Sequence, residues 1–151
     1  MKNLFDRNQA NEMIARIDNL TNETQPNWGK MNVAQMLAHS CVAYQMVYEE
    51  ENYPKATGFK RFMLKLFLKN LVCNEKPYKK NSRTAPHFLI TDERIFETEK
   101  SKLIGFINKT QELGASHFEG KESNSFGALN STEWNNSFSK HLDHHLTQFG
   151  V

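Results

Sequence analysis

Histidines are concentrated at the C-terminal end of the sequence. Six occur in the 151 residues, and three of them, His141, His144 and His145, lie within the last eleven. If this segment is helical, His141 and His145 share one face, with their Cβ atoms about 5–6 Å apart. Two imidazoles at that spacing suit adjacent coordination positions on one metal ion. The alternative is a pair of core imidazoles that hydrogen-bond to other protein groups, and the pair alone leaves both interpretations open.

A third histidine lies on another expected helix. His39 follows Met36 by three residues and lies at the edge of the apolar face of Val33–Tyr48. On a facing helix it would complete a set of three imidazole ligands, with the remaining positions open to water as in catalytic zinc sites. The alternative is that His39 only forms a hydrogen bond across the helix interface. His87 and His117 fall in expected loops, so we expect both on the surface.

Two polar residues beside the histidine pair are candidates for catalysis. His144, at the flank of the same helical face, could act as an acid or base, and Gln148, one turn beyond the pair, could orient a substrate. The segment HLDHH differs from the zinc-protease motif HExxH, because Leu142 stands where the general-base Glu would be. Cys41 lies two residues after His39, about 200° round a helix, so this pair is not expected to form a Cys–His nucleophile.

Five segments with helical periodicity must position these side chains. The expected helices are approximately Asn3–Leu20, Val33–Tyr48, Phe59–Val72, Phe96–Leu113 and Ser131–Phe149. Asn32 and Gln35 form a potential capping box at the start of the second helix. Gly114 follows the fourth helix, and Asn130 or Ser131 is the expected cap of the last.

The order of these segments predicts the fold class. Four longer helices joined by loops favour an all-α, antiparallel four-helix bundle, with Phe59–Val72 as an extra short helix. A parallel sheet is not expected, because apolar β-branched runs are lacking and the one strand-like piece, His87–Ile90, is too short. The segments 74–95 and 115–130 are expected to be loops. Without a linker or an internal repeat, the chain is expected to form a single domain over residues 1–151.

The composition excludes several classes of protein. Hydrophobic residues make up 38% of the chain, too many for a disordered protein, and no apolar run is long enough to span a membrane. A formal net charge of +2 gives no basis for nucleic-acid binding. The chain has only two cysteines, and Asp6 and Glu12 stand where a signal peptide would be apolar. We therefore expect a cytoplasmic protein.

The segment Phe59–Val72 combines apolar residues with four cations: Lys60, Arg61, Lys65 and Lys69. It could pack as a lid over the bundle end, pair with a second subunit, or lie on a membrane surface. The first two are favoured, because one short segment binds membranes only weakly. We therefore expect a homodimer and no stable membrane association.

Two segments carry a resemblance to a known group of proteins. WGKMNVAQMLAHS (Trp28–Ser40) and HLDHHLTQFGV (His141–Val151) look like the paired signature segments of the DinB-like superfamily. FETEKSKLIGFINKTQELG and HFEG…FGALNSTEW resemble one branch of it, small bacterial domains of unknown function, so the likeness covers most of the chain. The resemblance implies a four-helix bundle that binds a divalent ion, zinc or nickel, through three histidines. Carried over by motif, these ligands are His39, His141 and His145.

Relatives in that superfamily include thiol-dependent transferases that use bacillithiol or mycothiol, and a mycothiol-dependent isomerase. Those activities belong to other branches, so the resemblance implies the fold and the metal site more directly than the reaction. The first hypothesis is a metal-dependent enzyme of the thiol S-transferase or hydrolase type, acting on a small molecule with a low-molecular-weight thiol. In this hypothesis the ion lowers the pKa of a bound water or thiol, which then attacks an electrophile. The alternative is a non-catalytic, metal-stabilised or ligand-binding bundle that forms dimers.

Overall fold

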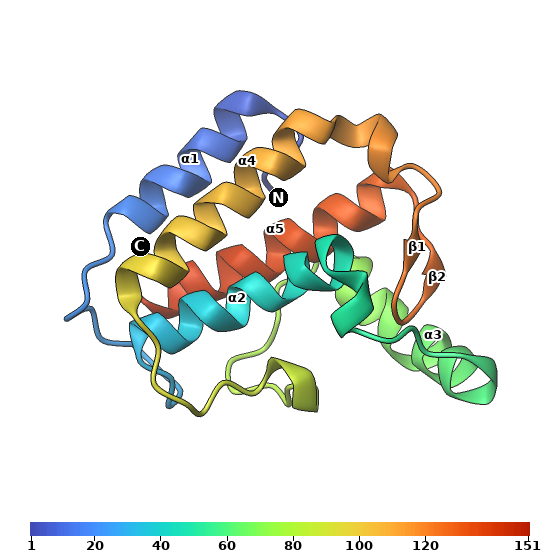
Figure 1. The fold of residues 1–151 in the computed structure, drawn as a ribbon, viewed down its shortest axis with the longest axis horizontal. Coiled ribbons are helices and arrows are strands. Elements are labelled where there is room, and N and C mark those ends of the chain that lie inside the picture. The colour runs from blue at the N-terminus through green and yellow to red at the C-terminus, as the bar shows by residue number, and fades with distance from the viewer.

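The computed structural model describes residues 1–151, and its regular structure is almost all helical (Figure 1). In order, the elements are α1 (Arg7–Asp18), α2 (Val33–Tyr48), η1 (Glu50–Asn52), α3 (Gly58–Cys73), η2 (Pro86–Phe88), α4 (Phe96–Phe118), β1 (Glu122–Ser123), β2 (Gly127–Ala128) and α5 (Ser131–Gln148). The predicted all-α fold is confirmed: α1, α2, α4 and α5 form a four-helix bundle, and α3 is the extra helix.

Side-chain caps explain where two of the bundle helices begin. The Asn32 side chain accepts a hydrogen bond from the Gln35 backbone N–H (2.8 Å), and the Gln35 side chain accepts one from the Asn32 N–H (3.1 Å). Asn130 and Glu133 form the same reciprocal pair at the start of α5. Each pair satisfies two backbone donors that a helix start leaves free, so α2 and α5 begin at defined residues.

The bundle consists of two antiparallel helix pairs, α1 with α4 and α2 with α5 (Figure 1). His39 of α2 lies beside His141 of α5, and Tyr44, further along α2, stacks on Phe138, which comes earlier in α5. By contrast, α2 and α4 run in the same direction. The reason is that α3 and the connection 74–95 return the chain to the end of the bundle where α2 begins.

An aromatic stack fills the middle of the bundle. Tyr44 lies nearly parallel to both Phe106 and Phe138, with interplanar angles of 7° and 5°. Trp134 stacks on Phe138, and Phe118 meets Phe138 edge-on at 5.7 Å. Such pairs add specific geometry to apolar burial. Because Phe138 is one turn before His141, this stack also fixes the position of the histidine pair relative to α2.

The end of α4 differs from the expected helix Phe96–Leu113. Gly114 has φ +70° and ψ 172°, which interrupts the helix where the sequence predicts its end. Residues 115–118 then form another helical turn, because Phe118 is fully buried between the Phe5 ring and the aromatic stack. The β1–β2 hairpin follows and leads into α5. The expectation of a continuous loop over 115–130 is therefore wrong in these two places.

The helix α3 leaves the bundle and contacts it mainly through its C-terminal end (Figure 1). Among its residues only Cys73 is buried. This arrangement does not match a lid over the bundle end, because most apolar side chains of α3 face solvent. None of the helices has the length and apolar character needed to cross a membrane.

Candidate metal centre

Three of the six histidines meet where α2 faces α5. His39 comes from α2, and His141 and His145 come from consecutive turns of α5. One ring nitrogen from each lies within 4.8 Å of the others, and the Nε2 atoms of His39 and His141 are 2.9 Å apart. The structure thus brings together the three residues that the sequence singles out.

The histidine pair of α5 lies at the border of the buried face of this helix. Leu142 and Leu146 are 1% and 0% exposed and belong to the core, whereas His141 is only half-buried. Successive residues of a helix are about 100° apart, so the most buried direction is offset from the histidines. His141 therefore lies at the edge of the buried face and not in its middle. The pair faces the seam between α2 and α5.

Hydrogen bonds to the outer ring nitrogens orient two of the imidazoles. The Nδ1 atom of His39 donates to the backbone carbonyl of Phe88 (2.7 Å), which assigns the proton to Nδ1 and leaves the Nε2 lone pair free. The Nδ1 atom of His145 donates to Oε1 of Gln148 (2.8 Å) in the same way. Metal-binding histidines usually carry such a bond, because it fixes both the tautomer and the orientation of the ring.

Gln148 is itself held by the backbone. Its Nε2 donates to the carbonyl of Trp28 (2.6 Å), so the amide presents Oε1 to His145. Gly29 has φ +88°, and a Cβ atom there would lie 2.5 Å from Gln148 Nε2, so both the backbone and the space require glycine. Gln148, a catalytic candidate by its sequence position, is engaged in positioning His145 and is not free to orient a substrate.

Burial keeps these imidazoles uncharged. It lowers the pKa of His39, and with the neighbouring histidines it lowers the pKa of His141 well below the usual value and that of His145 to about 3. The cluster contains no Asp or Glu. Neutral imidazole is the form that binds a metal ion, so the three side chains are in the ligand state at neutral pH.

The donor set fits a divalent transition-metal ion. Imidazole nitrogen suits zinc and nickel, and two ligands at about 2.0–2.1 Å from a tetrahedral zinc lie about 3.4 Å apart. The 2.9 Å separation between His39 and His141 is about 0.5 Å shorter, so the two nitrogens would have to move slightly apart to hold an ion. A hydrogen bond between the two rings is the alternative, with His141 as donor because the His39 proton is on Nδ1. That alternative engages only two of the three inner nitrogens, whereas an ion would engage all three.

Phe88 covers the cluster from the connection between α3 and α4. Its ring centroid lies 5.3 Å from that of His39 and 5.5 Å from that of His141, and its carbonyl accepts the His39 proton. Sequence reasoning missed this residue. The available signal was that FLI, beginning at Phe88, is the one apolar run in a long polar connection. Phe88 therefore both orients one imidazole and limits the access of water to two of them.

A comparison with protein families assigns the chain to one family. A family described as "Protein of unknown function (DUF1569)" matches residues 2–150. The chain belongs to the DUF1569 family. Among curated proteins and solved structures, nothing matches it. The site of this DUF1569 protein is therefore interpreted from its own geometry.

The other three histidines of the DUF1569 protein lie outside the cluster. His144 is half-buried, edge-on to Trp28 and Tyr78, and lines a small pocket of about 170 Å³ beside the site. His87 and His117 are exposed, as the sequence predicts. His87 is on η2, however, and His117 is on the last turn of α4, so neither lies in an irregular loop.

Neither cysteine of the DUF1569 protein is placed for nucleophilic chemistry. The Cys41 Sγ atom faces the backbone carbonyl of Glu99, away from His39, as the helical rotation predicts. Burial raises the pKa of Cys41 to about 12 and that of Cys73 to about 11. A thiol that stays protonated at neutral pH is a poor nucleophile, so neither cysteine is expected to add a nucleophile to the histidine cluster.

Proposed function

We propose that this DUF1569 protein binds a divalent metal ion, zinc or nickel, through His39, His141 and His145. The observation that carries the proposal is the meeting of three neutral imidazoles from two helices, two of them with a hydrogen bond on the outer nitrogen. Core histidines without a ligand role do not need their inner nitrogens to face one another. A site for an ion accounts for all three rings at once.

The proposal includes membership of the DinB-like superfamily. Support comes from the segments Trp28–Ser40 and His141–Val151, which resemble the signature segments of that superfamily. The first segment supplies His39 together with the Trp28 carbonyl that holds Gln148, and the second supplies the histidine pair. The two segments therefore contribute neighbouring parts of one site, as a paired signature should.

We extend the proposal to a reaction on a small molecule, of the thiol-transfer or hydrolytic type, with a low-molecular-weight thiol or water as nucleophile. A divalent ion held by three histidines supplies Lewis-acid chemistry and keeps coordination positions for a ligand. The side chains of this chain contribute positioning: Phe88 and Gln148 orient two imidazoles, and the Phe88 ring excludes water from one side. The partial exposure of His141 supports entry of a small molecule at this imidazole.

A metal-stabilised bundle without catalysis is the second candidate, and the burial of the site favours it. His39 and His145 are only 3% and 7% exposed, and Phe88 covers the seam. In this case the ion contributes to folding, and no substrate has to reach the imidazoles.

Elemental analysis of the purified protein tests the metal site. We expect one ion per chain in the wild type. In His39→Ala and in His141→Ala the metal content should fall about tenfold or more. His117→Ala removes an exposed histidine outside the cluster and should keep the ion. Unchanged metal content in His141→Ala, in protein whose circular dichroism is that of the wild type, would overturn the proposal.

Two further measurements separate the enzyme from the metal-stabilised bundle. Chelation should lower Tm in both cases, by about 10 °C if the ion contributes about 4 kcal/mol. Only the enzyme predicts turnover of electrophilic small molecules with a thiol or water, and this turnover should disappear in His141→Ala. A metal-loaded protein that turns over nothing in thiol-transfer and hydrolysis screens would favour the bundle.

A further inference from the structure

The helix α3 presents most of its apolar side chains to solvent. Six of its large apolar residues are between 40% and 76% exposed: Phe59, Phe62, Leu66, Phe67, Leu68 and Leu71. In the rest of the chain only Met1, Leu89 and Ile95 are exposed to this degree among large apolar residues. At about 100° per residue these six residues extend round roughly two thirds of the circumference of α3, and we call this exposed apolar surface the outer face of α3. A concentration of this kind marks an interaction surface, whereas single exposed apolar residues do not.

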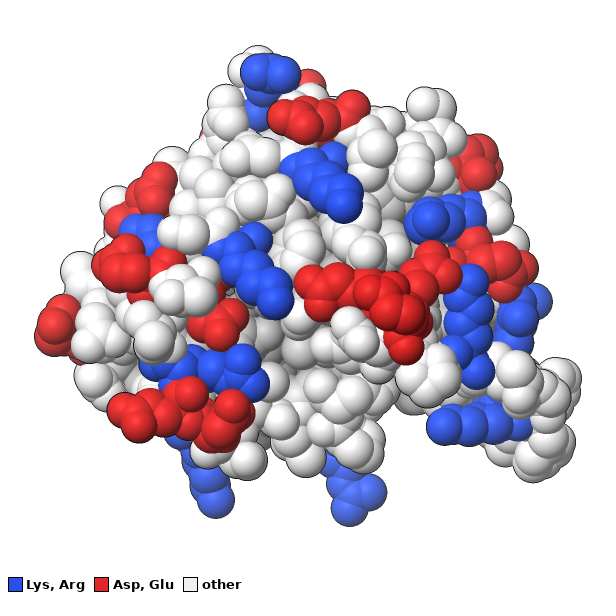
Figure 2. Space-filling view, in the orientation of Figure 1, with Lys and Arg blue, Asp and Glu red and all other residues white.

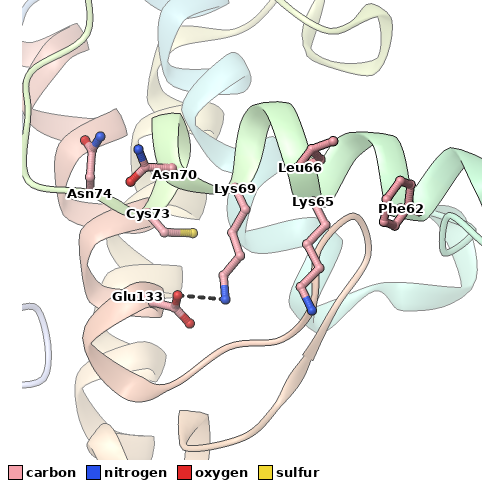
Figure 3. A pocket seen from close by; sticks show the side chains of 8 residues that line it. All are labelled: Phe62, Lys65, Leu66, Lys69, Asn70, Cys73, Asn74 and Glu133. Carbon is pink, nitrogen blue, oxygen red and sulfur yellow. Dashed lines mark ion pairs between the residues drawn. The ribbon is translucent and has the colours of Figure 1, made fainter.

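Two of the four basic residues of α3, Arg61 and Lys69, face the protein, whereas Lys60 and Lys65 are exposed. Arg61 pairs with Glu122 of the hairpin (2.5 Å), and Lys69 pairs with Glu133 at the start of α5 (2.7 Å; Figure 3). An amphipathic helix on a protein surface normally has the opposite arrangement, with apolar residues inside and charges in water. In Figure 2 the tip of α3 projects at the lower right and is white, with Lys and Arg side chains next to it. The outer face therefore needs a surface from outside this chain to bury it.

The C-terminal end of α3 is fastened to α5, which holds the outer face in a fixed orientation. Nζ of Lys140 donates to the carbonyls of Leu71 (2.7 Å) and Asn74 (2.6 Å), and Asn136 Nδ2 donates to the carbonyl of Cys73 (2.9 Å). Lys140 is 2% exposed, and its charge lies at the negative end of the α3 dipole. A helix anchored in this way presents a preformed surface and is not a lid that swings.

We infer that the outer face of α3 packs against the outer face of α3 in a second copy of this chain, related by a two-fold axis. The exposed apolar area is roughly 600 Å², on the basis of about 150–250 Å² for a large side chain. That is at the upper end for patches on monomers and approaches the roughly 800 Å² that each partner contributes to a specific interface. A two-fold axis lets the same patch serve both copies, so no other partner is needed to cover it.

Charges at the two ends of α3 favour an antiparallel arrangement. Exposed Lys60 lies in the first turn, and exposed Glu75 lies just beyond the last residue. In an antiparallel pair, Lys60 of each copy meets Glu75 and the helix C-terminus of the other, where a cation is favoured. A groove of about 550 Å³ between α3 and the start of α5 adjoins this surface; besides Phe62, Leu66 and Cys73 it is lined by five polar residues, Lys65, Lys69, Asn70, Asn74 and Glu133 (Figure 3).

A membrane surface is the less favoured occupant. Amphipathic helices bind anionic lipids through Lys and Arg next to the apolar face, and polybasic segments use about four to eight of them. Of the four cations of α3, Arg61 and Lys69 are paired with carboxylates of their own chain. Only Lys60 and Lys65 are left to meet lipid headgroups.

Sedimentation equilibrium of the full chain tests whether two copies associate through the outer face of α3. We expect the wild type to have twice the chain mass of 17.6 kDa and Phe59→Glu/Phe67→Glu to have the single mass, with dimerisation weakened at least about a hundredfold. Ile95→Glu, the same kind of change at a residue that is 71% exposed outside α3, should stay dimeric. All three proteins should have the same circular dichroism. A wild type that stays monomeric, or a dimer in Phe59→Glu/Phe67→Glu, overturns the inference.

Charge reversal tests the antiparallel arrangement. Lys60→Glu and Glu75→Lys should each weaken the dimer several-fold, and the double variant should restore it because opposite charges meet again. A double variant that is weaker than both single variants overturns the antiparallel arrangement. A monomeric wild type that sediments with anionic vesicles overturns the second copy as the occupant and assigns the outer face to lipid.

Discussion

The seam between α2 and α5 and the outer face of α3 depart from the usual burial pattern in opposite directions. In the seam, three imidazoles are buried or half-buried, whereas on α3 six large apolar side chains face solvent. Buried polar groups cost free energy unless they are bonded, and an exposed apolar patch costs free energy unless it is covered. This difference in kind is the basis of the two proposals: an ion for the imidazoles and a second copy of the chain for the helix.

One helix, α5, supports both regions. Lys140 faces α3, and the next residue, His141, faces α2, because neighbouring residues are about 100° apart round a helix. The groups that orient the imidazoles, Phe88 and Gln148, do not contact α3 through any hydrogen bond. Variants that damage one region should therefore leave the other intact.

The largest effect should come from acid on the metal-free protein. Burial lowers the pKa of His145 to about 3, from 6.5 for the exposed side chain, so between these values the unfolded chain binds a proton that the folded chain does not. Stability should therefore fall as pH drops from about 6.5 towards 3, by up to about 1.4 kcal/mol per pH unit for each such group. His39 and His141, whose pKa values are also lowered, add to the slope. Urea unfolding in chelator at a series of pH values measures it.

Matched variants assign this slope to the seam. His145→Gln should flatten the dependence of unfolding free energy on pH, because the buried titrating ring is gone. His117→Gln removes an exposed ring and should leave the wild-type profile. If the pH profile of His145→Gln superimposes on that of the wild type, burial of the imidazoles is not a source of acid sensitivity. The seam would then not differ from α3 in the way described above.

Removing the anchor of α3 should have the next largest effect. Lys140→Met keeps the aliphatic stem but leaves carbonyls of Leu71 and Asn74 without their donor, so we expect a loss of about 3 kcal/mol in unfolding free energy. Lys69→Met, at a partly exposed ion pair of the same helix, should cost less than about 1 kcal/mol. Urea unfolding measures both. Equal costs at the two positions would show that the buried lysine does not anchor α3.

The orientation of His145 should affect metal affinity more weakly than the loss of a ligand. Gln148→Leu removes the acceptor for His145 Nδ1, and we expect a Kd for zinc about 10–100-fold higher, which is about 1.4–2.7 kcal/mol. Gln148→Glu keeps the acceptor for His145 but loses the donor to the Trp28 carbonyl, so its Kd should lie between those of the wild type and Gln148→Leu. Gln25→Leu, at an exposed glutamine, is the control. Competition with a chromogenic chelator gives the affinities, and a wild-type Kd in Gln148→Leu would contradict the role of this bond.

The helix starts and the shared face of His141 and His145 depend on local chemistry and could be predicted from the sequence. The starts of α2 and α5 follow from caps that hydrogen-bond within three residues, as with Asn32 and Gln35. The placing of His141 and His145 on one face follows from helical rotation, whereas their meeting with His39 is what the DinB-like resemblance implies. The caps and the rotation both depend on spacing along one helix, which the sequence contains directly.

The parts that depend on the path of the chain could not be predicted. Phe88 reaches the site from a connection of 22 residues that has no periodic pattern, and the Trp28 carbonyl holds Gln148 from a distant segment. Phe118 continues α4 beyond Gly114 because the core lies next to it, which the residues after Gly114 do not indicate. The spacing of apolar residues in α3 would be the same whether its own chain or a second copy covers them. The sequence therefore does not indicate whether these residues face the bundle or solvent.

The smallest effect should come from the outer face of α3 itself. Leu66 is 60% exposed, so Leu66→Gln should change the unfolding free energy by less than about 0.5 kcal/mol at protein concentrations low enough for monomers. Leu142→Ala, at a leucine that is 1% exposed beside the imidazole cluster, should cost about 2–5 kcal/mol under the same conditions. At high concentration Leu66→Gln should become destabilising, because the interface that it weakens then contributes to folding. A concentration-independent cost above about 2 kcal/mol would mean that the chain itself covers Leu66, and α3 would then belong with the buried region.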